Sequence, residues 1–303
     1  MRIGVDLGGT KTEAIALDDD GTVRDRRRVA TPRAYEASVD AIVALVHDVE
    51  RATGRRGSVG IGIPGAVQPN GLVKNANSTW LIGRPLIADL EDRLGRPVRA
   101  SNDANCFAIS EAADGAGAGH DVVFGVILGT GVGGGIVVSG RALDGPNRVA
   151  GEWGHNPLPW MTADEYPGPP CYCGRRGCIE TFLSGPGLSA DLERSAGRTM
   201  TTAAIVAAAM RGDSACVAAL ERYHERLARA LGSVVNVLDP DIIVLGGGMS
   251  NLPGLETDVA RRLCATVFSP TVATPVVRNR HGDSSGVRGA AWLWPPGDLA
   301  DSG

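Results

Sequence analysis

The stretch that decides the fold is the N-terminal Met1-Arg-Ile-Gly-Val-Asp-Leu-Gly-Gly-Thr-Lys-Thr12. The apolar alternation over residues 3–7 predicts a strand, and residues 14–17 predict a strand that returns after a glycine turn. Gly8 and Gly9 lack a Cβ, so backbone N–H groups there can face an anion, with hydroxyls and a lysine following them. Two interpretations stay open: a grip on nucleotide phosphates and their metal, or an ordinary tight hairpin.

The composition predicts a cytoplasmic, water-soluble protein with two domains. The chain has 303 residues, 43% of them hydrophobic, which is enough for two cores. A net charge of −4 leaves no basic footprint for nucleic acid, and the arginines over residues 24–28 favour a solvated strand face. We expect no membrane span and no signal peptide, because the chain lacks an apolar run of about 18 residues and begins directly with a strand.

A second strand, glycine turn and strand follow about 120 residues later, which predicts two related lobes. Residues 122–128 and 136–138 are the expected strands, joined by Gly129-Thr-Gly-Val-Gly-Gly-Gly135. The pattern is neither a P-loop nor the dinucleotide fingerprint, because the glycines lead into a strand instead of a helix. A third glycine turn, over residues 246–250, follows a buried strand over 242–245.

The remaining periodic segments predict an α/β protein with its lobes joined near residues 112–120. The expected strands are 23–30, 59–63 and 98–101, and the expected helices are 36–53, 102–113, 216–238, 255–268 and a C-terminal one from 284.

Two polar segments follow predicted strands and are candidates for ligand binding. Lys74-Asn-Ala-Asn-Ser-Thr-Trp80 offers amides and an indole, which suit sugar hydroxyls and an apolar sugar face, although its asparagines also suit Asx turns. Asn102 and Asp103 come at the end of the strand over 98–101, where parallel sheets place ligand chemistry. Either residue alone could be the helix N-cap; that role does not require both.

Three cysteines within eight residues, Cys171, Cys173 and Cys178, predict a structural metal site. With His155 they form a Cys₃His set, typical of closed tetrahedral zinc sites. Free thiols are the plain alternative, and a redox pair is disfavoured because the spacing lacks a CxxC helix context. The loop that carries these four ligands, residues 155–178, is called the cysteine knot below. With its metal bound, it would fix the direction of the two flanking carboxylates, Glu152 and Glu180.

These motifs resemble the ROK family of sugar kinases over nearly the whole chain, and most closely its bacterial fructokinases of the manno(fructo)kinase type. The ExGH motif at 152–155 combined with CxCGxxGCxE at 171–180 is the specific part. DxGGT at residue 6 is weak alone, and the other matching runs are 62–65, 74–80, 102–106, 129–133, 151–160 and 281–294.

The resemblance implies an α/β, two-lobed actin-like ATPase (ribonuclease H-like) fold. The implied lobes are 1–118 and 119–283, with a zinc-binding loop over 155–180 and a C-terminal helix over 284–298 that packs back on the first lobe. The implied cofactors are ATP, Mg²⁺ and a structural Zn²⁺. A homodimer with no nucleic-acid or membrane partner is expected.

The resemblance also implies the role of each site residue. Asp103 is the expected catalytic base, and His155, Cys171, Cys173 and Cys178 are the expected zinc ligands. The sugar contacts would be Gly65, Asn77, Asn102, Asp103, Glu152, His155 and Glu180. ATP and its Mg²⁺ would be held by Asp6, Gly8, Gly9, Thr10, Lys11, Thr12, Gly129, Thr130, Gly131, Gly133, Gly246, Gly247 and Gly248, with Asp6 on the metal.

The expected activity is ATP-dependent phosphorylation of a hexose at its 6-hydroxyl, most closely D-fructose and also mannose. The runs over 74–80 and 153–160 favour fructose. The alternatives are a glucokinase or an N-acetylhexosamine kinase of the same family, or a non-catalytic sugar-sensing regulator. The regulator is disfavoured because those proteins carry an N-terminal helix-turn-helix, whereas this chain begins at its first strand.

Overall fold

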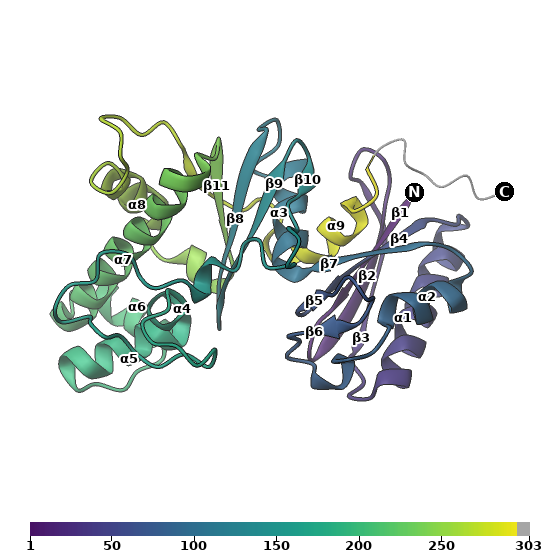
Figure 1. Cartoon of the computed structure of the whole chain (residues 1–303), viewed down its shortest axis with the longest axis horizontal. Coiled ribbons are helices and arrows are strands. Elements are labelled where there is room, and N and C mark those ends of the chain that lie inside the picture. The colour runs from purple at the N-terminus through teal and green to yellow at the C-terminus, as the bar shows by residue number, and fades with distance from the viewer. Residues whose placement is uncertain (296–303) are drawn as a thin grey trace. The chain divides into compact units, whose positions relative to one another are not determined.

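The computed structural model describes residues 1–295, which form two compact units (Figure 1). The first unit comprises residues 1–119, 135–150 and the C-terminal part from Arg280, and the second comprises 120–134 and 151–279. Residues 135–150 therefore group with the first unit, although they fall within the predicted second lobe.

The first unit is built on a five-stranded mixed sheet in the order β3-β2-β1-β4-β7. Its first three strands form an antiparallel meander, and β4 and β7 continue parallel to β1. Their bounds are β1 Arg2–Leu7, β2 Lys11–Leu17, β3 Val23–Ala30, β4 Ser58–Ile63 and β7 Val98–Asn102. The predicted opening hairpin and the strands after it are confirmed.

Helices cover both faces of this sheet (Figure 1). On one face, α1 (Tyr35–Thr53) and α2 (Leu86–Leu94) bury the apolar side chains of β1 at Ile3, Val5 and Leu7. On the other face, α9 (Ser285–Trp292) lies so close that a Cβ at Gly4 would be 2.1 Å from the carbonyl oxygen of Val287. The smaller elements of this unit are β5 Ala66–Val67, β6 Val73–Lys74, η1 Thr79–Leu81, α3 Asp103–Ala113, β10 Arg141–Ala142 and η4 Gly282–Ser284.

The second sheet has the order β10-β9-β8-β11-β12. Its strand β10 and the part of β9 from Gly135 group with the first unit, and the helices between residues 151 and 279 belong to the second unit. Its strands are β8 Val122–Leu128, β9 Val132–Val138, β11 Ile242–Gly246 and β12 Val276–Arg278. The helices are α4 Glu180–Leu183, α5 Gly185–Ala196, α6 Thr202–Met210, α7 Ser214–Leu238 and α8 Leu255–Leu263, with short η2 Trp153–His155 and η3 Gly248–Asn251.

Two predicted helices are shorter in the structure. The helix predicted over 255–268 ends at Leu263, because the Thr266 hydroxyl donates to the Leu263 carbonyl at 3.0 Å and packs on α7 at Gly232. The C-terminal helix ends at Trp292, and the last part of its predicted range, 296–298, lies outside the described residues.

The predicted glycine turn over 129–135 is wrong in its second half, because Gly133, Gly134 and Gly135 belong to β9. A Cβ at Gly134 would lie 2.9 Å from the Trp153 ring, and one at Gly135 would lie 2.6 Å from the Ala104 carbonyl oxygen. These two glycines therefore allow close packing of the strand and do not widen access to a ligand.

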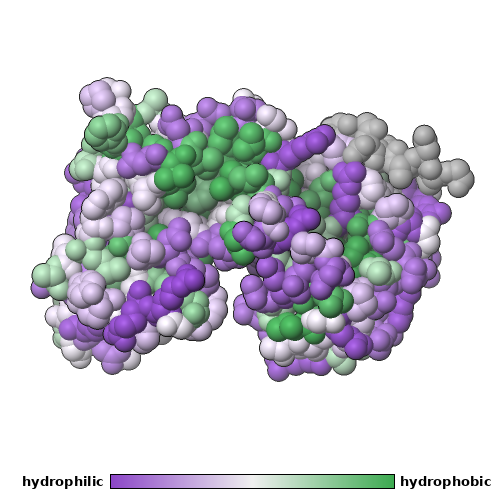
Figure 2. All heavy atoms as spheres, viewed as in Figure 1, coloured by the Kyte–Doolittle hydropathy of each residue, from purple (hydrophilic) through white to green (hydrophobic). Residues whose placement is uncertain are grey.

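Within residues 1–295, no single helix has the length and apolar composition of a membrane span, and the one pair that meets this test together, α6 with α7, is bent by 113°. The face drawn in Figure 2 mixes hydrophilic and apolar side chains. Phe268 and Val237 are the most exposed large apolar side chains of the described part, at 100% and 90%.

Candidate active site

Two carboxylates, Asp6 and Asp103, stand at the ends of parallel strands of the first sheet. Asp6 is the second-to-last residue of β1, and Asp103 is the first residue of α3, directly after β7. Burial raises the pKa of Asp6 to about 6, and the negative charges of Asp103 and Glu13 add to the rise, while Lys11 and Arg28 oppose it. A carboxylate beside a second carboxylate and two cations suits a site for a divalent cation and phosphates.

The turn of the opening hairpin is closed by its own backbone. The Gly8 N–H donates to the Lys11 carbonyl at 3.1 Å, and a Cβ at Gly8 would lie 2.8 Å from that oxygen. Thr12 points away from this turn: its buried hydroxyl pairs with that of Thr31 at 2.8 Å. Among the predicted phosphate-site residues of the hairpin, Lys11 and Thr10 remain exposed, whereas Thr12 is engaged in the fold.

Asn102 is the N-cap of α3, and Asp103 follows it as the first helical residue. The side-chain oxygen of Asn102 accepts from the Asn105 N–H at 3.0 Å, and its amide donates to Asp103 Oδ1 at 3.0 Å. The helix is buried from Ala104 to Glu111, whereas Asp103 is exposed. The capping asparagine thus orients an accessible carboxylate at the positive end of a helix.

In the predicted sugar-binding loop over 74–80, the tryptophan packs against the core of the first unit. The Trp80 indole N–H donates to Ser38 Oγ at 3.1 Å, and its ring packs against the α1 and α2 core. Asn75 has a φ of 54°, which fits the turn interpretation, and Asn77 is exposed. Gly65 has a φ of 77° and lies against the Lys74 backbone, so its glycine is required by the fold.

In the second unit, the predicted nucleotide-binding turns come together at the end of β8. The Gly129 N–H donates to the Gly131 carbonyl at 2.9 Å, which closes the β8–β9 turn. Gly247 has a φ of 81° and lies against the end of β8, so close that a Cβ on it would be 2.3 Å from the Leu128 carbonyl oxygen. The two glycine turns, far apart in sequence, are therefore neighbours.

Glu180 links this turn to the cysteine knot. Its Oε2 accepts from the Val132 N–H at 2.9 Å, and a Cβ at Gly131 would lie 2.6 Å from the same oxygen. Glu152, by contrast, is exposed next to the short helix η2. A side-chain substituent at Gly131 would displace the carboxylate.

The three cysteines and His155 form one compact donor set. Their ligand atoms all lie within 4.8 Å of one another, with Cys173 Sγ and Cys178 Sγ 3.6 Å apart and Cys171 Sγ 3.6 Å from His155 Nδ1. Tetrahedral zinc–thiolate geometry separates two sulfurs by roughly 3.7 Å, so the set fits a structural zinc ion. Burial, together with Cys173 and Cys171, raises the pKa of Cys178 to about 12, so zinc binding would have to release protons.

The outer nitrogen of His155 has a partner that the sequence analysis missed. Nδ1 faces Cys171, and Nε2 lies 2.9 Å from the Tyr172 hydroxyl. An outer partner of this kind orients a metal-ligating histidine. Tyr172 lies between two of the cysteines, and that position was the only sequence signal for it.

The knot is fixed to α7 on both of its flanks. Tyr223 donates to the Leu183 carbonyl at 2.9 Å, which holds α4 behind Glu180. Arg229 donates to the Trp160 carbonyl at 2.7 Å, in the loop between His155 and Cys171. Both α7 side chains are buried, so the knot rests on a rigid helix and not on metal binding alone.

A buried carboxylate, Glu165, completes this attachment. It accepts from Arg226 Nε and Arg229 Nη2, each at 2.7 Å, while Arg226 Nη1 also donates to Asp191 at 2.7 Å. Burial alone would raise the pKa of Glu165, but the hydrogen bonds from Arg229, Arg226 and the Thr162 N–H outweigh it and lower the pKa to about 2. The sequence signal was a pair of arginines three residues apart on an apolar helix face.

Comparison with known proteins gives the family. The ROK family profile matches residues 2–296. The N-acetyl-D-glucosamine kinase of Escherichia coli O6:H1 is 42% identical over 299 residues, which cover 97% of this chain and 99% of that protein.

The comparison with solved structures points to the same family. The ROK hexokinase of Thermus thermophilus aligns with a TM-score of 0.86 at 31% identity, over 96% of both chains. A ROK family glucokinase from Streptomyces griseus, solved with glucose and AMPPNP, aligns with a TM-score of 0.74 at 31% identity, over 96% of this chain and 98% of that one. The chain belongs to the ROK family and is a sugar kinase with the two-lobed actin-like ATPase fold.

Proposed function

We propose that this kinase transfers the γ-phosphoryl group of ATP to the 6-hydroxyl of N-acetyl-D-glucosamine. The observation that carries the choice of sugar is the 42% identity to N-acetyl-D-glucosamine kinases, which extends over 97% of the chain. An N-acetylhexosamine was one of the alternative substrates expected from the sequence, and it is better supported than fructose.

The two runs that favoured fructose have structural explanations. Trp80 donates its indole N–H to Ser38, and Trp153 donates its own to the Gly133 carbonyl at 2.9 Å while its ring is buried. Trp153 is buried, and Trp80 is partly buried against the core of its unit. These two tryptophans therefore give no argument for fructose.

ATP is the proposed phosphoryl donor. The paired glycine turns at Gly129–Gly131 and Gly246–Gly248 offer backbone N–H groups, and the opening hairpin offers Gly9, Thr10 and Lys11. Asp6 is the proposed holder of Mg²⁺, which in kinases neutralises charge on the phosphate oxygens. The structure of the Streptomyces relative with AMPPNP supports the nucleotide.

Asp103 is the proposed general base. It is exposed, oriented by Asn102, and shares an electrostatic environment with Asp6, so a hydroxyl bound near Asp103 would be close to the metal and phosphates. It accepts the proton of the attacking hydroxyl, while in-line positioning supplies most of the acceleration. Asn102, Glu152, His155 and Glu180 are the proposed sugar-hydroxyl contacts, with Gly65 and Asn77 as further ones.

Zinc would have a structural role at the Cys₃His set. Four protein donors leave no open position for a substrate, so the ion would fix the knot that carries His155 and Glu180.

The test is an ADP-release assay over a panel of sugars. We expect the highest kcat/KM for N-acetyl-D-glucosamine, above N-acetyl-D-mannosamine, D-glucose, D-mannose and D-fructose. A kcat/KM for D-fructose equal to or above that for N-acetyl-D-glucosamine would contradict the proposed specificity, and no ADP release with any sugar would contradict the kinase assignment.

A further inference from the structure

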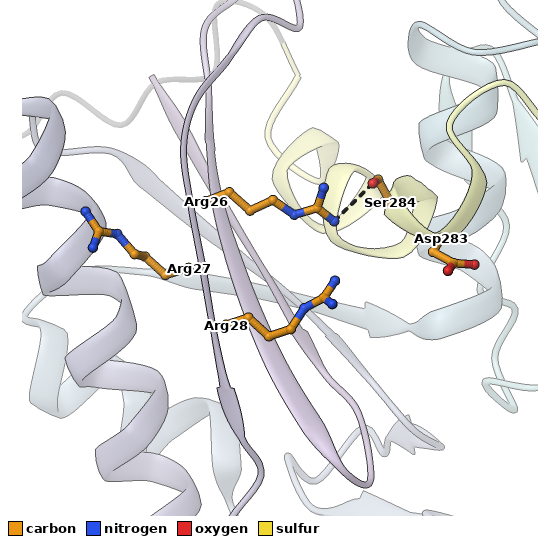
Figure 3. Close-up of a pocket in the computed structure, with 5 residues that line it drawn as sticks. All are labelled: Arg26, Arg27, Arg28, Asp283 and Ser284. Atoms are coloured by element: carbon orange, nitrogen blue, oxygen red, sulfur yellow. Dashed lines mark hydrogen bonds between the residues drawn. The ribbon is translucent and has the colours of Figure 1, made fainter.

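The edge of the first sheet carries a cavity that none of the proposed roles uses. It measures about 560 Å³ and is lined by Arg26, Arg27, Arg28, Asp283 and Ser284 (Figure 3). Among the strands of the described residues, β3 pairs only with β2, so the arginines lie on an edge strand. The sequence analysis interpreted this basic run as a solvated strand face, and the structure gives it more order than that.

Two of the three arginines are held in place by one buried carboxylate. Arg26 and Arg28 are two residues apart and project from the same face of β3. Both bind Glu13, which is only 5% exposed; Arg28 Nε lies 2.7 Å from Glu13 Oε2, and Arg26 Nε binds Oε1. A mobile surface arginine would have to be ordered on binding a ligand, whereas these two are already ordered.

Arg26 and Arg28 point toward the start of α9, and Arg27 does not. Arg26 Nη2 donates to Ser284 Oγ at 3.1 Å, and Figure 3 shows Arg28 directed to the same side. The Arg27 side chain projects from the opposite face of β3, toward α1, and its Nε donates to Asp25 at 2.7 Å.

The guanidinium groups offer the contacts for an anion, although the cavity carries no net charge. Glu13 balances one of its two guanidinium partners, and Asp283, which also lines the cavity, balances the other. Within residues 1–295, the Nη1 atoms of Arg26 and Arg28 bond to no protein group. A guanidinium with free N–H groups matches the oxygens of a phosphate.

The cavity shares its sheet face with Asp6. Asp6 pairs with Glu13 across β1 and β2, and Glu13 pairs with Arg28 across β2 and β3, so the three form one cross-strand row. The turn that carries Ser284 continues to Gly286, where a Cβ would lie 3.5 Å from Asp6 Oδ2.

We propose that Arg26, Arg28 and Ser284 form a phosphate-binding pocket beside Asp6. The phosphate belongs either to the nucleotide, a source that rests on the proposed kinase function, or to a separate phosphorylated ligand. The row from Arg28 to Asp6 favours the nucleotide. Glu13 acts as the positioning residue that holds both guanidinium groups toward the cavity.

The test compares Arg28→Gln with Arg27→Gln, its neighbour on the opposite face. Calorimetric titrations with MgATP, N-acetylglucosamine 6-phosphate and inorganic tripolyphosphate are made on the wild type and both variants. Loss of a charged hydrogen bond to phosphate should weaken binding of at least one probe by about tenfold or more in Arg28→Gln, and by less than about twofold in Arg27→Gln.

The probes distinguish the two sources. Weaker MgATP binding alone, or with tripolyphosphate, identifies the nucleotide, and weaker N-acetylglucosamine 6-phosphate binding alone identifies a sugar phosphate, the product of the proposed reaction included. Wild-type affinity of Arg28→Gln for every probe, or equal losses in Arg27→Gln, would overturn the pocket. If the wild type bound no MgATP, the proposed function would fail, while the other two probes would still decide about the pocket.

Two further variants cover the case in which Arg28→Gln does not fold, as judged by thermal unfolding. Arg28→Lys keeps the charge but loses the planar fork, so an intermediate loss is expected. Arg26→Gln removes the other guanidinium and should weaken the same probe. Unchanged binding in both variants would equally overturn the pocket.

Discussion

Asp103 combines exposure with a fixed direction, which is what a general base requires. Asn102 caps α3 and donates to Asp103 Oδ1, so the carboxylate is oriented by the same residue that begins the helix. The sequence allowed either residue as the cap. The structure assigns the cap to Asn102 and leaves Asp103 accessible.

Replacement of that carboxylate should separate binding from turnover. Asp103→Asn keeps the size of the side chain but cannot accept the hydroxyl proton, so kcat should fall by about 10²–10⁴-fold. The KM for sugar should change by only a few-fold, because the remaining sugar contacts are intact. Steady-state kinetics measure both, and turnover within a few-fold of the wild type would remove Asp103 from the role of base.

Removal of the Asp6 charge should have opposite effects on activity and on stability: activity should fall and stability should rise. Its pKa in the folded protein is raised to about 6, so the folded state binds this proton more tightly than the unfolded state does. The destabilisation from ionised Asp6 is therefore absent below about pH 4, grows as the pH rises, and is complete above about pH 6.

Asp6→Asn should accordingly abolish activity and stabilise the metal-free protein. We expect a gain of about 1–3 kcal/mol at pH 7.5, measured by denaturant unfolding, that shrinks toward zero near pH 4. A variant less stable than the wild type at pH 7.5 would refute this account of the buried carboxylate.

At the scale of elements, α7 is the platform of the cysteine knot. Its buried arginines bind the loop before Cys171, and Tyr223 holds α4 after it. The apolar periodicity of α7 was evident in the sequence, but its role was not. Buried arginines on that face acquire meaning only from Glu165 and Asp191, which lie 61 and 35 residues away from Arg226 in the chain.

Glu165 should make stability depend on acid pH. Its pKa is lowered to about 2, so its contribution is fully present above about pH 4.5 and is lost as the pH falls toward 2. Glu165→Gln should lower the free energy of unfolding by about 3 kcal/mol at pH 7, with a smaller difference from wild type below pH 4.5. Denaturant unfolding across this range is the measurement.

Glu225→Gln is the matched control. Glu225 also pairs with Arg229, but its side chain is 45% exposed. Its removal should change stability by less than about 1 kcal/mol. Equal effects from the two variants would show that burial of Glu165 adds nothing.

The cysteine knot provides a test of zinc with an internal control. Cys173→Ser removes one donor of the Cys₃His set, whereas Cys264→Ser changes an exposed cysteine outside it. Metal analysis should find about one zinc ion per chain in the wild type and in Cys264→Ser, and less in Cys173→Ser, which should also have a raised sugar KM. A fully active wild type without zinc would contradict the structural role.

Sequence patterns predicted elements more reliably than side-chain roles. The strands of the opening hairpin and the helix from Asp103 follow from local periodicity and capping. Gly134 and Gly135 were interpreted as turn residues, because nothing local distinguishes a turn glycine from one that meets Trp153 or Ala104 across the fold. For the same reason the indole of Trp80 was interpreted as suited to a sugar face, although its N–H binds Ser38.

At the scale of the whole molecule, the repeated strand–turn–strand pattern was the strongest clue. Both hairpins are present: β1–β2 lies within the first unit, whereas β8–β9 begins in the second unit and ends in residues 135–138, which group with the first. The grouping of residues 135–150 with the first unit was beyond sequence reasoning, because it depends on the packing of Gly135 against Ala104 and Ala108. Among the proposed site residues, Asp6 and Asp103 belong to the first unit and Glu180 belongs to the second.

The most direct test of the central claim is the identity of the product formed from ATP and N-acetyl-D-glucosamine. Phosphorus and proton NMR of the reaction mixture locate the transferred phosphate by its coupling to the sugar protons. The account predicts stoichiometric N-acetylglucosamine 6-phosphate and ADP. No phosphorylated sugar, or a phosphate on a hydroxyl other than the 6-hydroxyl, would contradict it.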